Sequence, residues 1–241
     1  MKTSRTFGVE IEMNGSFGRI YGKPDWVEGG NRNNRKKIHL QPGWKCVEDG
    51  SCGSEFVSPP LCDTLPIERQ IGDILLSGFD VKFEKAGLHV HVGAHDLTRH
   101  NCLELAQFCR HYERAIYSFV HPKRMKDEYC RPFWMSNADM NSSYNPETKL
   151  TNGNRYRGCN ITSYDKHGTI EYRYSESTID YAKIKALVDL FVKITDYVAN
   201  NKGNLRCKSP RKLKEKRIFL LDLVGVLPES RKKLIETTYK T

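Results

Sequence analysis

The chain has 241 residues, 38% of them hydrophobic and 28% charged, which is the balance of a globular protein large enough to bury a core. No apolar run approaches the roughly 20 residues of a membrane helix, and the first residues lack the apolar core of a secretion signal, so we expect a cytoplasmic protein without a membrane partner. The net charge of +10 favours polyanionic partners such as nucleotides, nucleic acid or acidic peptides.

The first half of the chain predicts strands and one helix. Apolar residues alternate at the two-residue period over residues 7–13, which indicates a half-buried strand. Residues 14–43 are basic and rich in Gly and Asn, so we predict a long loop there. Residues 44–48 and 54–58 flank a glycine-containing turn and predict a hairpin. The apolar positions over residues 65–77 are spaced as in an amphipathic helix.

Two short strands and a second helix follow. The strands are predicted at residues 79–83 and 88–92. Asn101 is followed three residues later by Glu104, which is the spacing of a helix-capping box, and the helical apolar pattern then continues to about Val120.

Residues 123–154 are polar and have few apolar anchors. A loop of this length is typical of a lid, a binding loop or a disordered segment. Trp134, Met135 and Tyr144 give it the side chains that a lid over an active site would use, and a disordered surface loop is the alternative.

The last third of the chain predicts a strand pair and three helices. Residues 156–164 and 169–174 have the strand pattern, with residues 165–168 as the turn between them. Asp180 is placed to cap a helix whose apolar face continues to Val198. Two short helices near residues 211–224 and 228–238 complete the chain.

The predicted strands occur as hairpins, and the helices between them follow no regular order. This order favours an α+β domain around a mainly antiparallel sheet. No glycine-rich phosphate loop joins a strand to a helix, so neither a Rossmann nor a P-loop site is indicated. We assign residues 1–205 to a catalytic domain and residues 206–241 to a basic helical extension packed on it. The stretch 206–217 has seven basic residues and one acidic residue, which is typical of a solvated face or of a surface for an acidic or nucleic-acid substrate.

Polar side chains share one face on several predicted strands. Residues two apart on a strand point the same way, and this spacing joins Glu10 with Glu12, His89 with His91, and Glu171 with Arg173. Glu48 and Glu55 lie on the two strands of the hairpin. Glu10 and Glu12 alone would fit a strand face in water, but the recurrence predicts one sheet whose concave face is a polar cavity, with helices packed on the other side.

The residue types in this cavity predict a metal–nucleotide site. The eight cysteines are scattered without a C-x-x-C pair, so a zinc site is not indicated. Oxygen ligands suit Mg²⁺ or Mn²⁺, and the candidate ligands are Glu10, Glu12, Glu48, Glu55 and Glu171. The planar guanidinium groups of Arg155, Arg157 and Arg173 suit the phosphates of a nucleotide.

These segments resemble the successive motifs of the amidoligase family, whose members are carboxylate–amine ligases similar to glutamate–cysteine ligase and glutamine synthetase. The motifs occur in the family's order across about residues 7–180. They are FGVEIEM at 7–13, EDGS at 48–51, EFVSPP at 55–60, GLHVHVG at 87–93, RGCN at 157–160 and TIEYR at 169–173.

The resemblance implies a glutamine synthetase-like catalytic domain that binds ATP and two or three Mg²⁺ ions on the concave face of a curved sheet. A carboxylate attacks the γ-phosphate to give an acyl phosphate, and an amine then displaces phosphate. The implied metal ligands are Glu10, Glu12, Glu55 and Glu171, with Glu48 or Asp49 as a further candidate. The implied catalytic residues are Arg173, Arg157, His89, His91 and Glu55, and the implied nucleotide contacts are Arg155, Arg173, Asn160 and His91.

Two other functions fit the same residues. A phosphotransferase on the same fold would phosphorylate an acceptor and stop. A metal-dependent nuclease or nucleic-acid-binding protein would use the net positive charge, although the sequence has no recognisable DNA-reading element. Amidoligases of this family occur in phages and bacteria. The resemblance also implies a substrate carried on a macromolecule, and the basic stretch 206–217 would hold that macromolecule.

Overall fold

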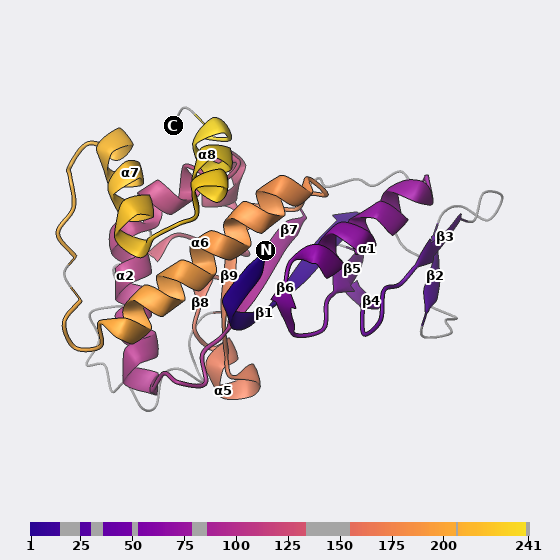
Figure 1. The fold of residues 1–241 in the computed structure, drawn as a ribbon, viewed down its shortest axis with the longest axis horizontal. Helices are drawn as coiled ribbons and strands as arrows, with labels where there is room; N and C mark the ends of the chain where they lie inside the picture. Colours follow the sequence, from indigo (N-terminus) through magenta and orange to yellow (C-terminus); the bar gives the residue numbers. More distant parts are fainter. Residues whose placement is uncertain are drawn as a thin grey trace.

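The computed structural model describes residues 1–14, 25–29, 36–49, 53–78, 86–133, 155–205 and 207–239. Its main sheet contains the strands β1 (Lys2–Asn14), β4 (Lys45–Asp49), β5 (Gly53–Val57), β6 (Leu61–Asp63), β7 (Gly87–Gly93), β8 (Cys159–Asn160) and β9 (Thr169–Glu176). Within the described residues these seven strands pair antiparallel in the order β4–β5–β1–β7–β9–β8, and β6 pairs with the start of β1 (Figure 1). The expected α+β class with a mainly antiparallel sheet is therefore confirmed.

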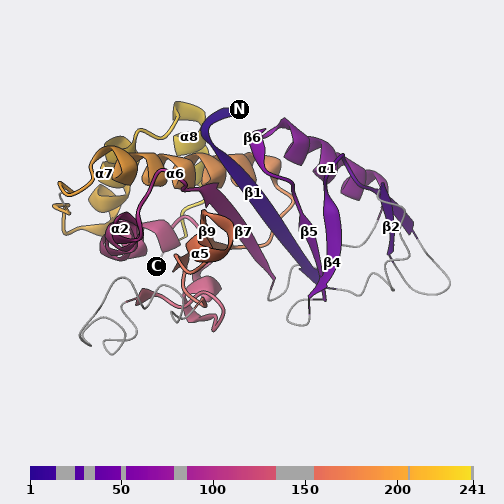
Figure 2. The ribbon, with the colours of Figure 1, turned by 90° about the horizontal axis from the view of Figure 1, so that it is seen from below.

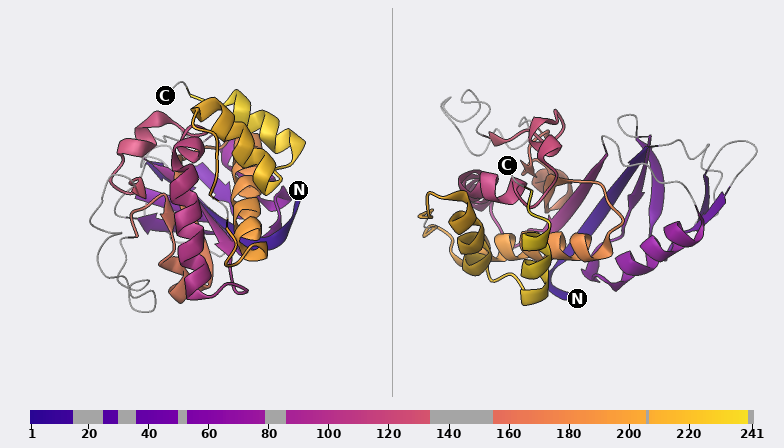
Figure 3. Two further views of the ribbon diagram at one scale, coloured as in Figure 1. Left: turned by 90° about the vertical axis from the view of Figure 1, so that its left-hand side faces the viewer. Right: turned by 90° about the horizontal axis from the view of Figure 1, so that it is seen from above.

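The longer helices lie against one face of this sheet, and one short helix borders the opposite face. The helices are α1 (Leu65–Leu76), α2 (Arg99–Tyr117), α5 (Ser163–His167), α6 (Tyr181–Asn200), α7 (Leu213–Val224) and α8 (Pro228–Glu236). Figure 2 shows α6 and α1 along the same side of the strands, and Figure 3 shows α2 running beside α6. The C-terminal helices form an outer layer, since α7 packs on α2 and α8 packs on α6. Among the described helices, none combines the length and the apolar character that a membrane crossing requires.

The alternating residues of the strands explain why the helices cover one face. Val9, Ile11 and Met13 of β1 are almost completely buried. On β9 the ring of Tyr172 stacks on Phe191 of α6, with ring centres 4.3 Å apart. The core therefore lies between the apolar side of the sheet and α6, and the intervening residues of the same strands point to the opposite face.

Several elements match the sequence prediction. The strand at residues 7–13, the hairpin of β4 and β5, and the helix α1 are all present. The carboxylate of Asp180 accepts a hydrogen bond from the backbone N–H of Lys183 and caps α6 as expected. The two predicted C-terminal helices are α7 and α8.

The predicted loop at residues 14–43 contains a small second sheet, so that prediction is wrong for its described part. β2 (Trp26–Gly29) pairs with β3 (Lys36–His39). Val27 and Ile38 lie opposite each other in this pair and are buried. One apolar pair among polar residues is too short a pattern to indicate strands, and burial of that pair by the rest of the fold explains the difference.

Helix α2 begins one turn earlier than predicted. Its N-cap is Thr98, whose hydroxyl accepts a hydrogen bond from the backbone N–H of Asn101 at 3.2 Å. Asn101 is the third helical residue, and its side-chain oxygen accepts the backbone N–H of Thr98. Both residue types cap helices well, and Thr98 is the one with extended backbone angles. The helix ends at Tyr117, before the predicted Val120.

The predicted turn at residues 165–168 is the short helix α5, which ends at Gly168 with φ of 65°. That positive φ suits glycine and closes the helix before β9. The strand predicted at 156–164 is reduced to the two residues of β8. A 3-10 helix, η1 (Pro122–Lys126), occupies the start of the predicted loop at 123–154. The predicted strand at 79–83, the lid residues Trp134, Met135 and Tyr144, and Arg206 lie outside the described residues.

Candidate active site

The strand register brings the predicted polar residues to one face of the sheet. Glu10 of β1 lies opposite His89 of β7, and His91 lies opposite Glu171 of β9. On the other side of β1, Glu12 lies opposite Glu55 of β5. Residues directly opposite each other in an antiparallel pair share a face, so these groups converge on the face away from α6.

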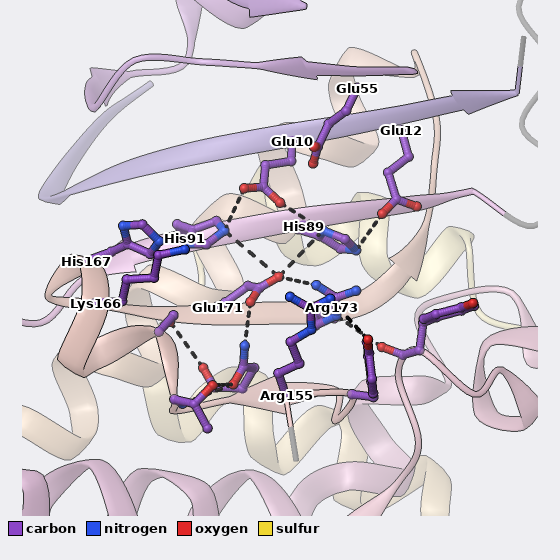
Figure 4. Close-up of a pocket in the computed structure, with 15 residues that line it drawn as sticks. Glu10, Glu12, Glu55, His89, His91, Arg155, Lys166, His167, Glu171 and Arg173 are labelled. Atoms are coloured by element: carbon purple, nitrogen blue, oxygen red, sulfur yellow. Dashed lines mark hydrogen bonds and ion pairs between the residues drawn. The ribbon is translucent and has the colours of Figure 1, made fainter. Parts of the chain in front are cut away.

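A cavity of about 580 Å³ lies over this face and is drawn in Figure 4. All the predicted site residues line it except Glu48 and Arg157. The view shows the acidic side chains of β1, β5 and β9 pointing toward the two histidines of β7. The residues at this site that were predicted from the sequence and line the cavity are Glu10, Glu12, Glu55, His89, His91, Arg155, Asn160, Glu171 and Arg173.

His89 stands at the centre of the acidic residues. Its Nδ1 lies 2.9 Å from Oε2 of Glu10 and 3.6 Å from Oε1 of Glu171, and its Nε2 lies 3.3 Å from Oε1 of Glu12. The side chain is only 3% exposed. A buried imidazole among three carboxylates holds all three in a fixed arrangement.

His91 and Glu10 each shift the pKa of the other toward its charged form. The Nε2 of His91 lies 3.1 Å from Oε1 of Glu10, and its Nδ1 lies 3.2 Å from the hydroxyl of Thr169. Burial alone would lower the pKa of His91, but its contact with Glu10 outweighs burial and raises it. Burial alone would raise the pKa of Glu10, and hydrogen bonds to His89 and His91 lower it instead.

Glu171 is ionised for a related reason. Burial would raise its pKa, but the charges of His89, Arg173 and His91 lower it. The Nη1 of Arg173 pairs with its Oε1, and the amide of Asn160 donates to its Oε2 at 2.6 Å. These charges therefore favour the deprotonated form of Glu171 although its side chain is buried.

The donor atoms of this face fit a divalent cation. The ligand atoms of Glu10, Glu55 and His89 lie within 4.8 Å of one another, and so do those of Glu10, His91 and Glu171. Glu10 belongs to both groups. Its lowered pKa supplies the ionised oxygen that hard cations such as Mg²⁺ and Mn²⁺ prefer.

Positive side chains stand beside the acidic ones. The Nε of Arg173 donates to the backbone oxygen of Tyr129 at 3.0 Å, which fixes the guanidinium at the cavity wall. Arg155 is exposed and lies over the ring of Tyr156, with its guanidinium carbon 5.0 Å from the ring centre. Lys166 of α5 is a further cation that lines the cavity. Together they supply donors for an anionic ligand such as a phosphate.

Two residues that support the site were missed in the sequence. The backbone N–H of Gly87 donates to Oε2 of Glu12 at 2.5 Å. A Cβ at Gly87 would lie 2.8 Å from Nε2 of His89 and 3.0 Å from Nη2 of Arg124. Arg124 itself is buried and donates to the backbone oxygen of Arg173 at 2.9 Å. Gly87 is the first residue of the segment GLHVHVG, so the sequence could have indicated it. No sequence pattern indicated Arg124.

Glu48 does not join the other predicted ligands. In the β4–β5 pair it lies opposite Ser54, and its neighbour Val47 lies opposite Glu55. Glu48 and Glu55 therefore occupy opposite faces, because a difference of one residue in register reverses the direction of a side chain. The side chain of Asp49, the alternative ligand, lies outside the described residues, as do Gly50 and Ser51.

Arg157 is also separate from the cavity. It is buried beneath the site, where its Nη1 donates to the backbone oxygen of Pro132 at 2.9 Å and its guanidinium lies 5.9 Å from the ring of Phe133. These contacts hold the chain segments on either side of residues 134–154 together. These contacts are structural, and the phosphate contact of Arg157 stays a prediction.

Comparison with known proteins points to one family. Residues 134–195 match a family described as putative amidoligase enzyme. The amidoligase match covers about a quarter of the chain and includes β8, β9 and the site residues Arg155, Asn160, Glu171 and Arg173. It confirms the family resemblance of the sequence motifs and supports a ligase-type enzyme. No curated protein matches the chain.

Proposed function

We propose that this protein is an ATP- and Mg²⁺-dependent ligase that joins a carboxylate to an amine through an acyl phosphate. The observation that carries the proposal is one cavity in which two potential metal-binding groups share Glu10 and adjoin Arg155 and Arg173. The amidoligase match supports the reaction class. A nucleotide site needs both features, because metal ions and guanidinium groups neutralise different parts of a triphosphate.

The proposal assigns a role to each part of the cavity. Glu10, Glu12, Glu55 and Glu171 would hold Mg²⁺, with His89 and His91 fixing the carboxylates. When bound, Mg²⁺ would screen the repulsion between the substrate carboxylate and the triphosphate. Arg173 and Arg155 would bind phosphate oxygens. Arg124 and Tyr129 keep Arg173 in place by their contacts with its backbone and side chain.

In the proposed reaction an oxygen of the substrate carboxylate bonds to the γ-phosphorus of ATP, and the bond from that phosphorus to the bridging oxygen of ADP breaks. The amine nitrogen then bonds to the acyl carbon, and inorganic phosphate leaves with the electron pair of the broken carbon–oxygen bond. An amine that enters as an ammonium ion gives up two protons. One proton ends on the phosphate and the other is released.

The proposal extends to the architecture. We place the sheet with the glutamine synthetase-like catalytic domains, with the site on its concave face and helices α1 and α6 on the other. Residues 1–205 would form the catalytic domain, and residues 206–241 would form the basic extension. The antiparallel pairing and the one-sided helix layer support this placement.

The test measures ADP release by the purified chain with ATP and Mg²⁺. A ligase releases ADP only when both a carboxylate and an amine are present. Hydroxylamine separates a ligase from a phosphotransferase, because an acyl phosphate reacts with hydroxylamine to give a hydroxamate and an ordinary phosphate ester does not. If calorimetry detects no binding of Mg²⁺–ATPγS, the proposed function is wrong.

A further inference from the structure

A row of polar and positive side chains lies where α7 packs on α2, at the opposite end of the molecule from α1 (Figure 1). His111, Arg114 and the C-cap residue Ser118 follow one another along α2 at three- and four-residue spacing, which places them on one face of the helix. At a rise of about 1.5 Å per residue, this row is about 10 Å long.

Two cations of α7 lie against this row. The Nζ of Lys216 is 5.5 Å from the ring centre of Tyr112. The Nε of Arg217 donates a hydrogen bond to the hydroxyl of Ser118 at 2.6 Å. The positive side chains of the two helices therefore form one continuous surface. We call this surface the basic strip, and it consists of His111, Arg114, Lys216 and Arg217.

The cations of the basic strip repel one another. Burial and the charge of Arg114 lower the pKa of Lys216, and burial and the charge of Lys216 lower the pKa of His111. Among the described residues, no carboxylate forms an ion pair with Arg114, Lys216 or Arg217. An anion bound here would relieve this repulsion.

The acidic residues that neighbour the basic strip in sequence have other partners. Glu113 is buried, and its Oε2 accepts the backbone N–H of Phe133 at 2.9 Å. Glu215 is exposed, and its Oε1 lies 3.7 Å from the Nζ of Lys212. The positive charge of the strip is therefore available to a ligand.

The surroundings of the basic strip favour a nucleic acid over an acidic protein. The centre of a protein interface is rich in aromatic and apolar side chains, and the large apolar side chains exposed in the described part of the chain lie on other elements than α2 and α7. Interfaces with nucleic acid are polar and strongly positive. Proteins that bind single strands stack the bases on aromatic rings, and the ring of Tyr112 is buried. The strip therefore suits a duplex.

We propose that the basic strip binds the phosphate backbone of a double-stranded nucleic acid. Phosphates of one strand follow at about 3.4 Å along the duplex axis, so a strip of about 10 Å spans about three of them. Arg114, Lys216 and Arg217 supply three charges for these phosphates. No residue of the strip lines the active-site cavity, so this inference does not depend on the proposed ligase function.

The experiment compares the loss of two charges from the basic strip with the same loss elsewhere. The strip variant is Arg114→Gln with Lys216→Gln. The matched control is Arg69→Gln with Lys45→Gln, which removes the charges of an exposed arginine of α1 and an exposed lysine of β4. A third protein, Arg114→Lys with Lys216→Arg, keeps the charge of the strip and changes its side chains.

Binding is followed by the fluorescence anisotropy of labelled DNA and RNA duplexes of about two helical turns. The full chain is titrated in EDTA, which keeps metal out of the active site, at several NaCl concentrations between about 50 and 200 mM. Thermal melting by circular dichroism checks that each variant is folded.

We expect the wild type to bind a duplex with a slope of log Kobs against log salt of about −3 or steeper, because each neutralised phosphate contributes about −0.9. The strip variant should lose about 2 of this slope and about tenfold or more in affinity at about 0.1 M salt. The control and the charge-retaining variant should keep the slope and the affinity of the wild type. The duplex that binds more tightly identifies the natural form of the backbone.

Four results would overturn the proposal. The first is the absence of salt-dependent binding of either duplex by the wild type. The second is an equal loss in the strip variant and the control, which would assign binding to the net charge of the chain. The third is tighter binding of a single strand of the same sequence. The fourth is displacement of the duplex by polyglutamate more readily than by unlabelled duplex, which would assign the strip to an acidic protein.

Discussion

The two faces of the main sheet are built by the same strands and have opposite chemistry. On β1, Val9 and Ile11 point into the core beneath α6, while Glu10 and Glu12 point into the open cavity. Full burial of each apolar side chain contributes about 1.5–3 kcal/mol to stability. The buried carboxylates of the other face gain little, because the loss of their hydration offsets their contacts with His89.

The comparison shows that alternate residues of one strand can carry separate tasks. On β9, Tyr172 and Tyr174 stack on Phe191. Glu171 and Arg173, which alternate with these tyrosines along the strand, face the cavity. Substitutions on the helix-covered face should therefore change stability and leave ligand binding intact. Substitutions on the open face should change ligand binding strongly and stability only slightly, and the experiments below try to break this separation.

The largest effect is expected for Phe191→Ala. Removing a buried ring that stacks on two tyrosines should lower the free energy of unfolding by about 3–5 kcal/mol. Urea denaturation measures this loss, and Phe191→Leu should lose less. The folded fraction should bind Mg²⁺–ATPγS with unchanged affinity, and a large loss of affinity would show that the two faces are coupled.

The next effect is expected for Glu10→Gln. Glu10 is shared by both potential metal groups, so its neutralisation should weaken Mg²⁺–ATPγS binding about 100-fold or more, the upper range for changes beside a metal site. The matched control is Glu48→Gln, which removes the same charge from the other face of the adjacent hairpin and should leave the affinity unchanged. Equal affinities for the two variants would remove Glu10 from the site.

A smaller effect is expected for Gly87→Ala. The added Cβ would lie too close to His89, Arg124 and Glu12, so the side chains around the cavity must shift. We expect about a tenfold loss of Mg²⁺–ATPγS affinity, which is typical of a change behind the ligands. Calorimetry checks the affinity, and an unchanged value would mean that the site tolerates the shift.

The smallest effect is a difference in pH dependence between the helix layer and the open face of the sheet. Burial raises the pKa of Asp189, which lies on α6 under α8, whereas histidine contacts lower the pKa of Glu10 against the effect of burial. A carboxyl with a raised pKa loses its stabilising contribution as pH rises through its folded pKa. A carboxyl with a lowered pKa loses it as pH falls through its folded pKa.

The stability of the metal-free wild type relative to Asp189→Asn should therefore fall with rising pH above the ordinary aspartate range. The stability of the metal-free wild type relative to Glu10→Gln should instead increase with rising pH below the ordinary glutamate range. Urea denaturation at several pH values gives both slopes. Slopes of the same sign would contradict the assigned directions.

Strand periodicity predicted much of this arrangement. The two-residue spacing of Glu10 with Glu12 and of His89 with His91 was sufficient to place each pair on one face, and Asp180 marked the start of α6. Such local signals work because a strand or a helix cap is defined by neighbouring residues.

Features set by register and long-range packing were not predictable. Glu48 and Glu55 lie close in sequence, and only the pairing of β4 with β5 places them on opposite faces. Arg124 lies 49 residues from Arg173, whose backbone it holds, and no local pattern reports that contact. The cavity over Gly8 of β1 also arises between strands, at a position where the residue has no side chain.

The most direct test of the metal–nucleotide site is a crystal structure with Mn²⁺ and ATPγS, in which anomalous scattering locates the metal. We expect Mn²⁺ bonded to Glu10 and to at least one of Glu55 and Glu171, with the phosphates toward Arg173. Manganese density that touches none of Glu10, Glu12 and Glu171 would contradict the assignment of this face as the active site.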